Sequence, residues 1–256
     1  MTEMAVDKKE LYQYLIRLGD NALILGQRLS EWCGHGPVLE QDIALTNIAL
    51  DLIGQTRSWY QYAAQVEGKG RTEDEIAHFR DAPEFLNVLL VEQPNEDWAH
   101  TIVRQFLFDA FNFYLHEELC HSNDEQVAAI ANKSIKEIAY HLRYSSEWMI
   151  RLGDGTEESH QKMQDALDDL WMFAGEQVEE DALDKSMAEQ GIGASLPKIK
   201  SLYFNKVHEI LDKATLQKPE GEWFQEGGKQ GRHSEHLGFI LTELQYMQRT
   251  YPGQEW

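Results

Sequence analysis

Three pairs of a glutamate and a histidine, each spaced three residues apart, are the first candidates for metal chemistry in this sequence. They are Glu75 with His78, Glu118 with His121, and Glu157 with His160. Residues three apart share one face of a helix, so both side chains can reach one metal ion. We interpret all three pairs as linker or helix-end residues, because none lies at the middle of a predicted long helix. Metal ligation is the alternative interpretation.

The middle of the predicted bundle is more informative. A ferritin-like dimetal protein has one carboxylate on each of two helices and a Glu-x-x-His pair on each of the other two. Here Ile138 precedes His141 by three residues, and the corresponding positions on another helix are Leu52 and Gln55. Apolar side chains cannot ligate a metal, and a carboxamide is a poor substitute for imidazole. We therefore expect a degenerate site, with no metal ligand and no catalytic residue, and interpret His141 as a core histidine rather than a ligand.

Several polar residues within these predicted helices are candidates for burial. They are Asn47, Asp51, Glu137 and His141. An unpaired buried charge is costly. We therefore expect Asp51 or Glu137 to pair with a base, and the candidate bases are Arg57, Arg143 and His141.

The helices that position these residues are predicted from apolar spacing and from the scarcity of proline. Apolar residues between 11 and 32 recur at alternating steps of four and three, which is typical of a bundle seam. No strand pattern of alternating period is present. We predict an all-α fold, a ferritin-like long-helix bundle with additional C-terminal helices, in a single domain over residues 1–256. Core helices are expected at about 8–32, 39–67, 96–121 and 124–152, and extra helices at about 157–178, 196–214 and 234–249.

Composition and charge exclude several classes of partner. The 256 residues include 23 basic and 44 acidic side chains, for a net charge of −21, which argues against nucleic acid and anionic membrane as partners. The two cysteines, Cys33 and Cys120, form neither a disulfide framework nor a zinc pattern. The N-terminus is polar and no apolar run reaches the length of a membrane span, so we expect a cytoplasmic protein.

Five separated segments, occurring in one order, carry a resemblance to a known family. They are residues 31–37 (EWCGHGP), 42–55 (DIALTNIALDLIGQ), 89–95 (LLVEQPN), 136–143 with 151–156 (KEIAYHLR, RLGDGT), and 233–253. Over essentially its whole length the chain resembles the C subunits of bacterial phenylacetyl-CoA epoxidase, also called ring 1,2-phenylacetyl-CoA monooxygenase.

The resemblance implies a ferritin-like, structural and non-catalytic subunit in aerobic phenylacetate degradation. Such a subunit pairs with the diiron catalytic A subunit, which epoxidises the aromatic ring, and supports its stability and activity. The complex also contains further small subunits and a reductase subunit. Electrons come from NADPH through the flavin and iron–sulfur groups of the reductase, and the chain itself is expected to hold no cofactor.

Alternatives to that function remain open at the level of sequence. The chain could be an independently metal-binding ferritin-like oxidase or iron-binding protein, or a free-standing helical scaffold. In the absence of its partner subunits, the chain could form a homodimer. Candidate interface residues are Trp32, His233, Glu235 and His236. The alternative for the segment from His233 onward is a helix that caps the chain's own core.

Overall fold

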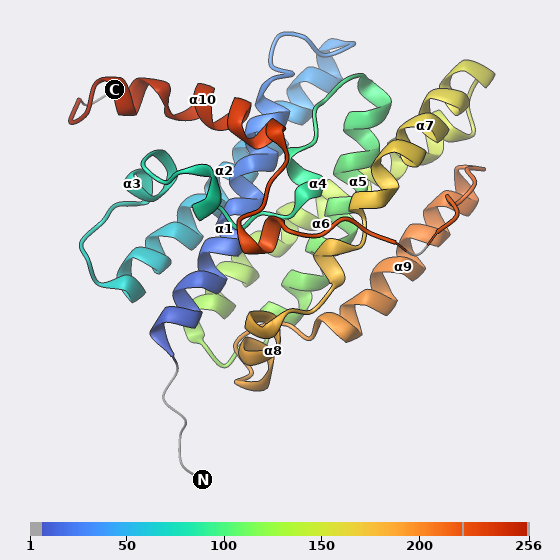
Figure 1. Cartoon of the computed structure of the whole chain (residues 1–256). Coiled ribbons are helices and arrows are strands. Elements are labelled where there is room, and N and C mark those ends of the chain that lie inside the picture. The colour runs from blue at the N-terminus through green and yellow to red at the C-terminus, as the bar shows by residue number, and fades with distance from the viewer. Residues whose placement is uncertain (1–6, 222, 255–256) are drawn as a thin grey trace. The chain divides into compact units, whose positions relative to one another are not determined.

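The protein is described here by a computed structural model that covers residues 7–221 and 223–254 (Figure 1). The polar N-terminal segment lies mostly outside this range, because residues 1–6 are not described. Across the covered residues the secondary structure is helical and contains no strand, which confirms the predicted all-α class. The chain divides into two compact units, Met1–Val88 with Gly227–Trp256 and Leu89–Glu226, which are described separately. The single ferritin-like domain stays a prediction.

The first unit is built on a long antiparallel hairpin. Helix α1 (Lys8–Ser30) begins at the N-cap Asp7, whose side chain accepts from the amide of Lys9, and α2 (Leu39–Glu67) ends at the left-handed Gly68. The two helices pack against each other, with Gly19 at the middle of α1 against Tyr60 and Gly26, closer to the end of α1, against Ala49. At Gly19 an added Cβ would overlap the Tyr60 ring, so this position requires glycine, whereas a Cβ at Gly26 would make contacts of 3.4 Å.

Four shorter elements complete the described part of this unit. They are α3 (Glu73–His78), the 3-10 turns η1 (Ala82–Glu84) and η4 (Gly228–Gln230), and α10 (Glu235–Thr250). Although α10 comes at the far end of the chain, it packs against α3 and α1 (Figure 1). The Gln245 amide donates to the carbonyls of Ala77 at 3.1 Å and Arg80 at 2.9 Å, which ties α10 to the end of α3.

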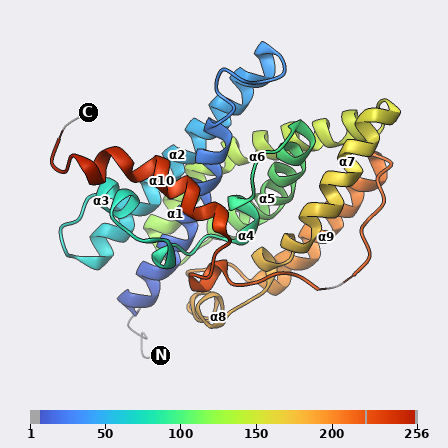
Figure 2. The ribbon, with the colours of Figure 1, turned by 45° about the horizontal axis from the view of Figure 1, so that its top comes forward.

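The second unit repeats the plan of a long hairpin with covering helices. It contains α4 (Leu89–Glu92), α5 (Trp98–Leu119), α6 (Glu125–Gly153), α7 (Glu157–Leu170), α8 (Ala182–Glu189) and α9 (Leu196–Lys213). Helices α5 and α6 are antiparallel, since Asn132 donates to the Cys120 carbonyl near the turn while Ser145 meets Asp109 farther along. Helices α7 and α9 each pack on both α5 and α6 (Figures 1 and 2).

Two stretches differ from the expected helices. The segment expected as one helix over 157–178 leaves the α conformation after Leu170 and continues as the 3-10 turns Trp171–Phe173 and Glu176–Val178. Between the turns, Gly175 lies against the ring of Phe224, where any Cβ would overlap it. Helix α8 was not predicted; its start is marked by a capping box of Asp181 and Asp184.

Candidate functional site: a buried polar cluster in the α5–α6 hairpin

The cluster is centred on a carboxylate in the most apolar helix of the second unit. Residues 101–112 of α5 are buried throughout, and Asp109 is fully buried among them. The helix is started by the N-cap Asp97, whose side chain accepts from the His100 amide, and α6 by the N-cap Asp124. The packing of α5 on α6 places Asp109 opposite Ser145 of α6.

Polar contacts to Asp109 come from one residue on its own helix and one on α6. The Gln105 side-chain amide donates to Oδ1 at 2.7 Å. The Ser145 hydroxyl lies 2.8 Å from Oδ2 and 3.0 Å from the carbonyl of His141, so it can donate to either. Among the residues described, Asp109 has no ion pair at all.

Burial decides the protonation of this carboxyl group. It raises the pKa of Asp109 to about 7, although the nearby His141 and the hydrogen bonds from Ser145 and Gln105 favour the ionised form. His141 itself is fully buried on α6. The cluster therefore holds a carboxyl group that is poised between its neutral and charged forms near neutral pH.

These residues do not fit a dimetal centre. The α5–α6 hairpin of such a protein would supply a carboxylate from one helix and a Glu-x-x-His pair from the other. Asp109 and His141 are two residues of ligand type, but the position three before His141 is Ile138, which is fully buried and apolar. Within the covered ranges, no group of three or more His, Cys, Asp or Glu side chains is arranged to hold a metal ion.

In the first unit, the positions on α2 that a dimetal protein would fill with Glu and His also lack a strong metal ligand. Leu52 is fully buried and Gln55 nearly so. The neighbouring helix α1 does bury a carboxylate, Asp20, but both of its oxygens already accept hydrogen bonds from protein donors. Oδ1 accepts from Arg80 at 2.5 Å and from the Tyr60 hydroxyl, and Oδ2 accepts from Arg80 at 3.1 Å and from the Leu86 amide at 2.7 Å.

The Asp20 cluster is a buried ion pair with its hydrogen bonds satisfied. Burial opposes the charge on Arg80, but Asp20 and Tyr60 outweigh it and raise the pKa of Arg80 above its usual range. Its guanidinium also lies 4.0 Å from the centroid of the Phe85 ring and donates to the carbonyls of Ile76 and Glu84. The cluster thus fastens the segment after α3 to α1.

The predicted buried polar residues are placed differently from one another. His141 is buried, whereas Asp51 and Glu137 are half-buried and their predicted pairing with a base stays a prediction. The prediction that Asn47 is buried is wrong, because it lies on the exposed side of α2 with Ile43 (50% exposed) and Leu50 (61% exposed). An apolar centre does not mean that a helix is covered all round.

The predicted interface residues are spread along the first unit. Trp32 is half-buried after the end of α1, and Glu235 is exposed in the first turn of α10. His236 is half-buried, and the His233 ring lies 2.8 Å from the carbonyl of Phe85, so His233 also has a role within the unit. Whether these side chains contact another protein stays a prediction.

The three Glu-x-x-His pairs serve helix ends. Glu75 closes the capping box of α3 with Thr72. Glu118 pairs with Lys198 on α9, and the His160 ring lies 2.7 Å from the carbonyl of Gly153. None of the pairs belongs to either buried cluster.

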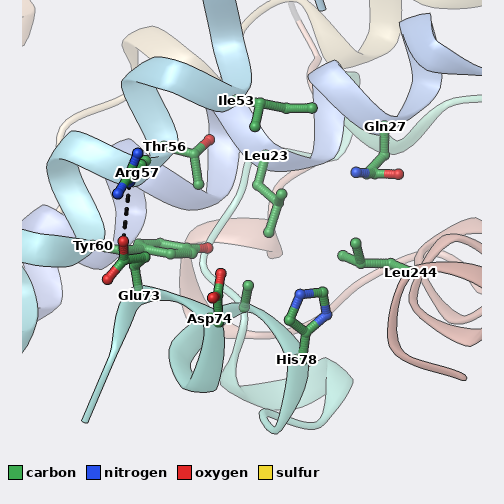
Figure 3. A pocket seen from close by; sticks show the side chains of 11 residues that line it. Leu23, Gln27, Ile53, Thr56, Arg57, Tyr60, Glu73, Asp74, His78 and Leu244 are labelled. Carbon is green, nitrogen blue, oxygen red and sulfur yellow. Dashed lines mark hydrogen bonds and ion pairs between the residues drawn. The ribbon is translucent and has the colours of Figure 1, made fainter. Parts of the chain in front are cut away.

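His78 lines a pocket that lies within the first unit and has a volume of about 430 Å³. Burial lowers the pKa of His78, and Asp74 partly offsets this effect. Figure 3 shows Arg57 reaching Glu73 at the pocket, 3.0 Å from its carboxylate. The lining residues come from four helices: Leu23, Gln27, Ile53, Thr56, Arg57, Tyr60, Glu73, Asp74, Ala77, His78 and Leu244.

Sequence reasoning missed the two carboxylates at the centre of the buried clusters. Asp109 interrupts a run of aromatic and aliphatic residues, and Asp20 lies among the buried residues of α1. A lone carboxylate in an apolar stretch was the available signal, since Asp is seldom fully buried without a partner. Their partners, Ser145 and Arg80, could not be read from spacing because they lie on other elements.

Comparison with known proteins identifies the family. The family described as "Phenylacetic acid catabolic protein" matches residues 1–256. A relative from Escherichia coli (strain K12), the C subunit of 1,2-phenylacetyl-CoA epoxidase, is 48% identical over 247 residues, which cover 96% of this chain and 99% of the relative. These matches show that the chain belongs to the phenylacetic acid catabolic protein family.

Proposed function

We propose that this member of the phenylacetic acid catabolic protein family is a structural, non-catalytic subunit of a phenylacetyl-CoA 1,2-epoxidase. The observation that carries the proposal is the 48% identity to the E. coli epoxidase subunit over nearly the full length of both chains. The alignment covers 96% of this chain and 99% of the relative. The proposed role therefore concerns the whole chain rather than one motif.

The buried cluster supports a non-catalytic role. Oxygen activation at a dimetal centre requires the complete carboxylate and imidazole set, and the α5–α6 hairpin offers Asp109 and His141 beside an apolar Ile138. We propose that the chain holds no cofactor of its own and pairs in the cytoplasm with a diiron catalytic A subunit. In this proposal, small subunits and a reductase with flavin, iron–sulfur and NADPH supply the remaining functions.

A long-helix fold remains useful to such a complex after the loss of its metal ligands. Permanent complexes bury broad surfaces, and long helices provide an extended face for a partner. No helix in the described part of the chain is long and apolar enough to cross a membrane. We propose that the exposed apolar side chains of α2, among them Ile43 and Leu50, contact a partner protein.

Two measurements test this function together. The chain is co-expressed with the catalytic subunit and passed over a gel-filtration column, and the iron content of each protein is measured after ferrous loading and desalting. We expect co-elution, with iron in the catalytic subunit and well below about one atom per copy of this chain. Iron near about two atoms per chain would instead establish the independently metal-binding oxidase or iron-binding protein.

A further inference from the structure

The outward face of α6 carries a row of aromatic rings. Tyr140, Tyr144 and Trp148 are spaced one turn apart, with ring centroids 6.3 and 6.4 Å apart. The ring of Trp98, from the start of α5, meets Trp148 edge-on at 6.0 Å. Tyr140 is exposed and the next two rings are half-buried. The row is thus open to solvent at one end and anchored in the unit at the other.

Two exposed arginines lie on this row. The guanidinium carbon of Arg143 is 5.5 Å from the centroid of the Tyr140 ring, and that of Arg151 is 4.9 Å from the Trp148 ring. A guanidinium held over an aromatic face keeps its N–H donors directed at its surroundings. We call residues Tyr140, Arg143, Tyr144, Glu147, Trp148 and Arg151 the aromatic–arginine face.

Within the described ranges, the two arginines of this face lack the ion pairs that the lysines of α9 have. Over the described residues, Arg143 and Arg151 have no ion pair, and the same holds for the exposed Lys136 and Lys133, one and two turns before Tyr140. The lysines of α9 all have carboxylate partners: Lys198 with Glu118, Lys200 with Glu179, and Lys206 and Lys213 with Glu209. Helix α6 thus carries four bases that have no ion pair among the described residues, in a chain with 44 acidic and 23 basic side chains.

The acidic residues nearby do not neutralise the face. Glu147 is exposed between the two arginines in sequence, and Glu137 is half-buried one turn before Tyr140. Within the aromatic–arginine face itself, two arginines therefore stand beside one glutamate, Glu147. The face is locally basic on a chain whose net charge is −21.

We propose that the aromatic–arginine face binds an acidic helix of the oxygenase partner, an inference that rests on the proposed function. Trp, Tyr and Arg are the residues that most often dominate the energy of protein interfaces. Arginine pairs with carboxylates through two parallel hydrogen bonds, and the adjacent rings exclude water from those bonds. Charge complementarity thus selects a helix with carboxylates one to two turns apart, flanked by apolar side chains.

The test uses the full chain and the co-expressed catalytic subunit. We expect the double variant Arg143→Glu/Arg151→Glu to raise the Kd of the pair at least about 30-fold, which corresponds to about 2 kcal/mol. The matched control Lys198→Glu/Lys213→Glu makes the same change in charge at exposed sites of α9 and should bind as the parent does. Thermal unfolding of each variant checks that the fold is intact.

A second variant separates charge from stacking. Arg143→Lys/Arg151→Lys keeps both charges and removes the planar forks, so its Kd should rise by less than that of the glutamate variant. Unchanged binding of the glutamate variant, with the parent pair co-eluting, overturns the inference and leaves the proposed function standing. If the parent pair does not associate, the proposed function fails and the inference fails with it. If the glutamate change disrupts only self-association of this chain, the occupant is a second copy and the inference is overturned.

Discussion

Each of the two units buries one aspartate near the middle of the first helix of its long hairpin, and the two carboxylates are held in opposite ways. Asp20 on α1 receives two hydrogen bonds from the Arg80 guanidinium, with Tyr60 and the Leu86 amide completing its shell. Asp109 on α5 receives a hydroxyl and a carboxamide, with no ion pair in the described part of the chain.

The difference teaches that burial alone does not determine what a carboxylate does. With a guanidinium in place, Asp20 is part of a buried ion pair, which raises the pKa of Arg80. Without a cation, burial raises the pKa of Asp109 to about 7. We interpret the first as a structural fastening and the second as a ligand-type residue that remains without the other groups of a metal site.

Removing the Asp20 carboxylate from its ion pair with Arg80 should have the largest effect on stability. Asp20→Ala leaves Arg80 buried without its counter-charge, and breaking a buried pair in this way costs about 3–5 kcal/mol. The free energy of unfolding from urea titration measures the loss. The double variant Asp20→Ala/Arg80→Met should recover part of it, because no buried charge is then left. A loss below about 1 kcal/mol for the single variant would show that water reaches Arg80.

Local sequence signals located the long helices well. Helix α2 spans Leu39–Glu67, the expected range, because Pro37 precedes it and Gly68 follows. The end of α7 was missed, because the helix stops at Leu170 in a stretch without an early Gly or Pro. Beyond Leu170 the chain continues as 3-10 turns, and Gly175 between them packs on Phe224, a residue distant in sequence that spacing cannot reveal.

The site was only partly accessible from sequence for a similar reason. Ile138 and His141 drew attention because a ligand motif fixes their spacing on one helix. Asp109 was missed, since the groups that surround it come together only when α5 and α6 pair. Asn47 was misplaced because the apolar residues around it, Ile43 and Leu50, are exposed. Exposure of one helix face depends on which neighbours are present, and composition does not report that.

Deprotonation of the Asp109 carboxyl group should make the free energy of unfolding depend on pH. Because its pKa in the folded protein is raised to about 7 from 3.8, the folded state holds the proton more tightly than the unfolded state. The stabilisation from this proton is complete below about pH 4 and is lost as pH rises to about 7. Asp109→Asn removes the titration while keeping a similar shape.

The measurement is the difference in unfolding free energy between the parent and Asp109→Asn from pH 4 to 8. The parent should lose up to about 4 kcal/mol relative to the variant across the window. Burial lowers the pKa of His116 to about 4, which gives a slope of opposite sign, but both proteins contain His116 and its contribution cancels. A flat difference curve would mean that Asp109 is ionised in the folded protein throughout.

The smallest expected effect tests whether the close packing of α1 on α2 at Gly19 supports the Asp20–Arg80 ion pair. Gly19 lies directly against the Tyr60 ring, where a Cβ would overlap it, so Gly19→Ala should push away the ring whose hydroxyl reaches Asp20. Overpacking of this kind costs about 1–3 kcal/mol, more than the gain in helix propensity of up to about 1 kcal/mol. Gly54→Ala on α2 is the matched control, because nothing lies within 4 Å of its added Cβ. Urea titration should show Gly54→Ala slightly stabilised and Gly19→Ala destabilised. Equal stability of the two variants would mean that Tyr60 can move away without loosening Asp20 and Arg80, and the Asp20–Arg80 ion pair would then be independent of the packing at Gly19.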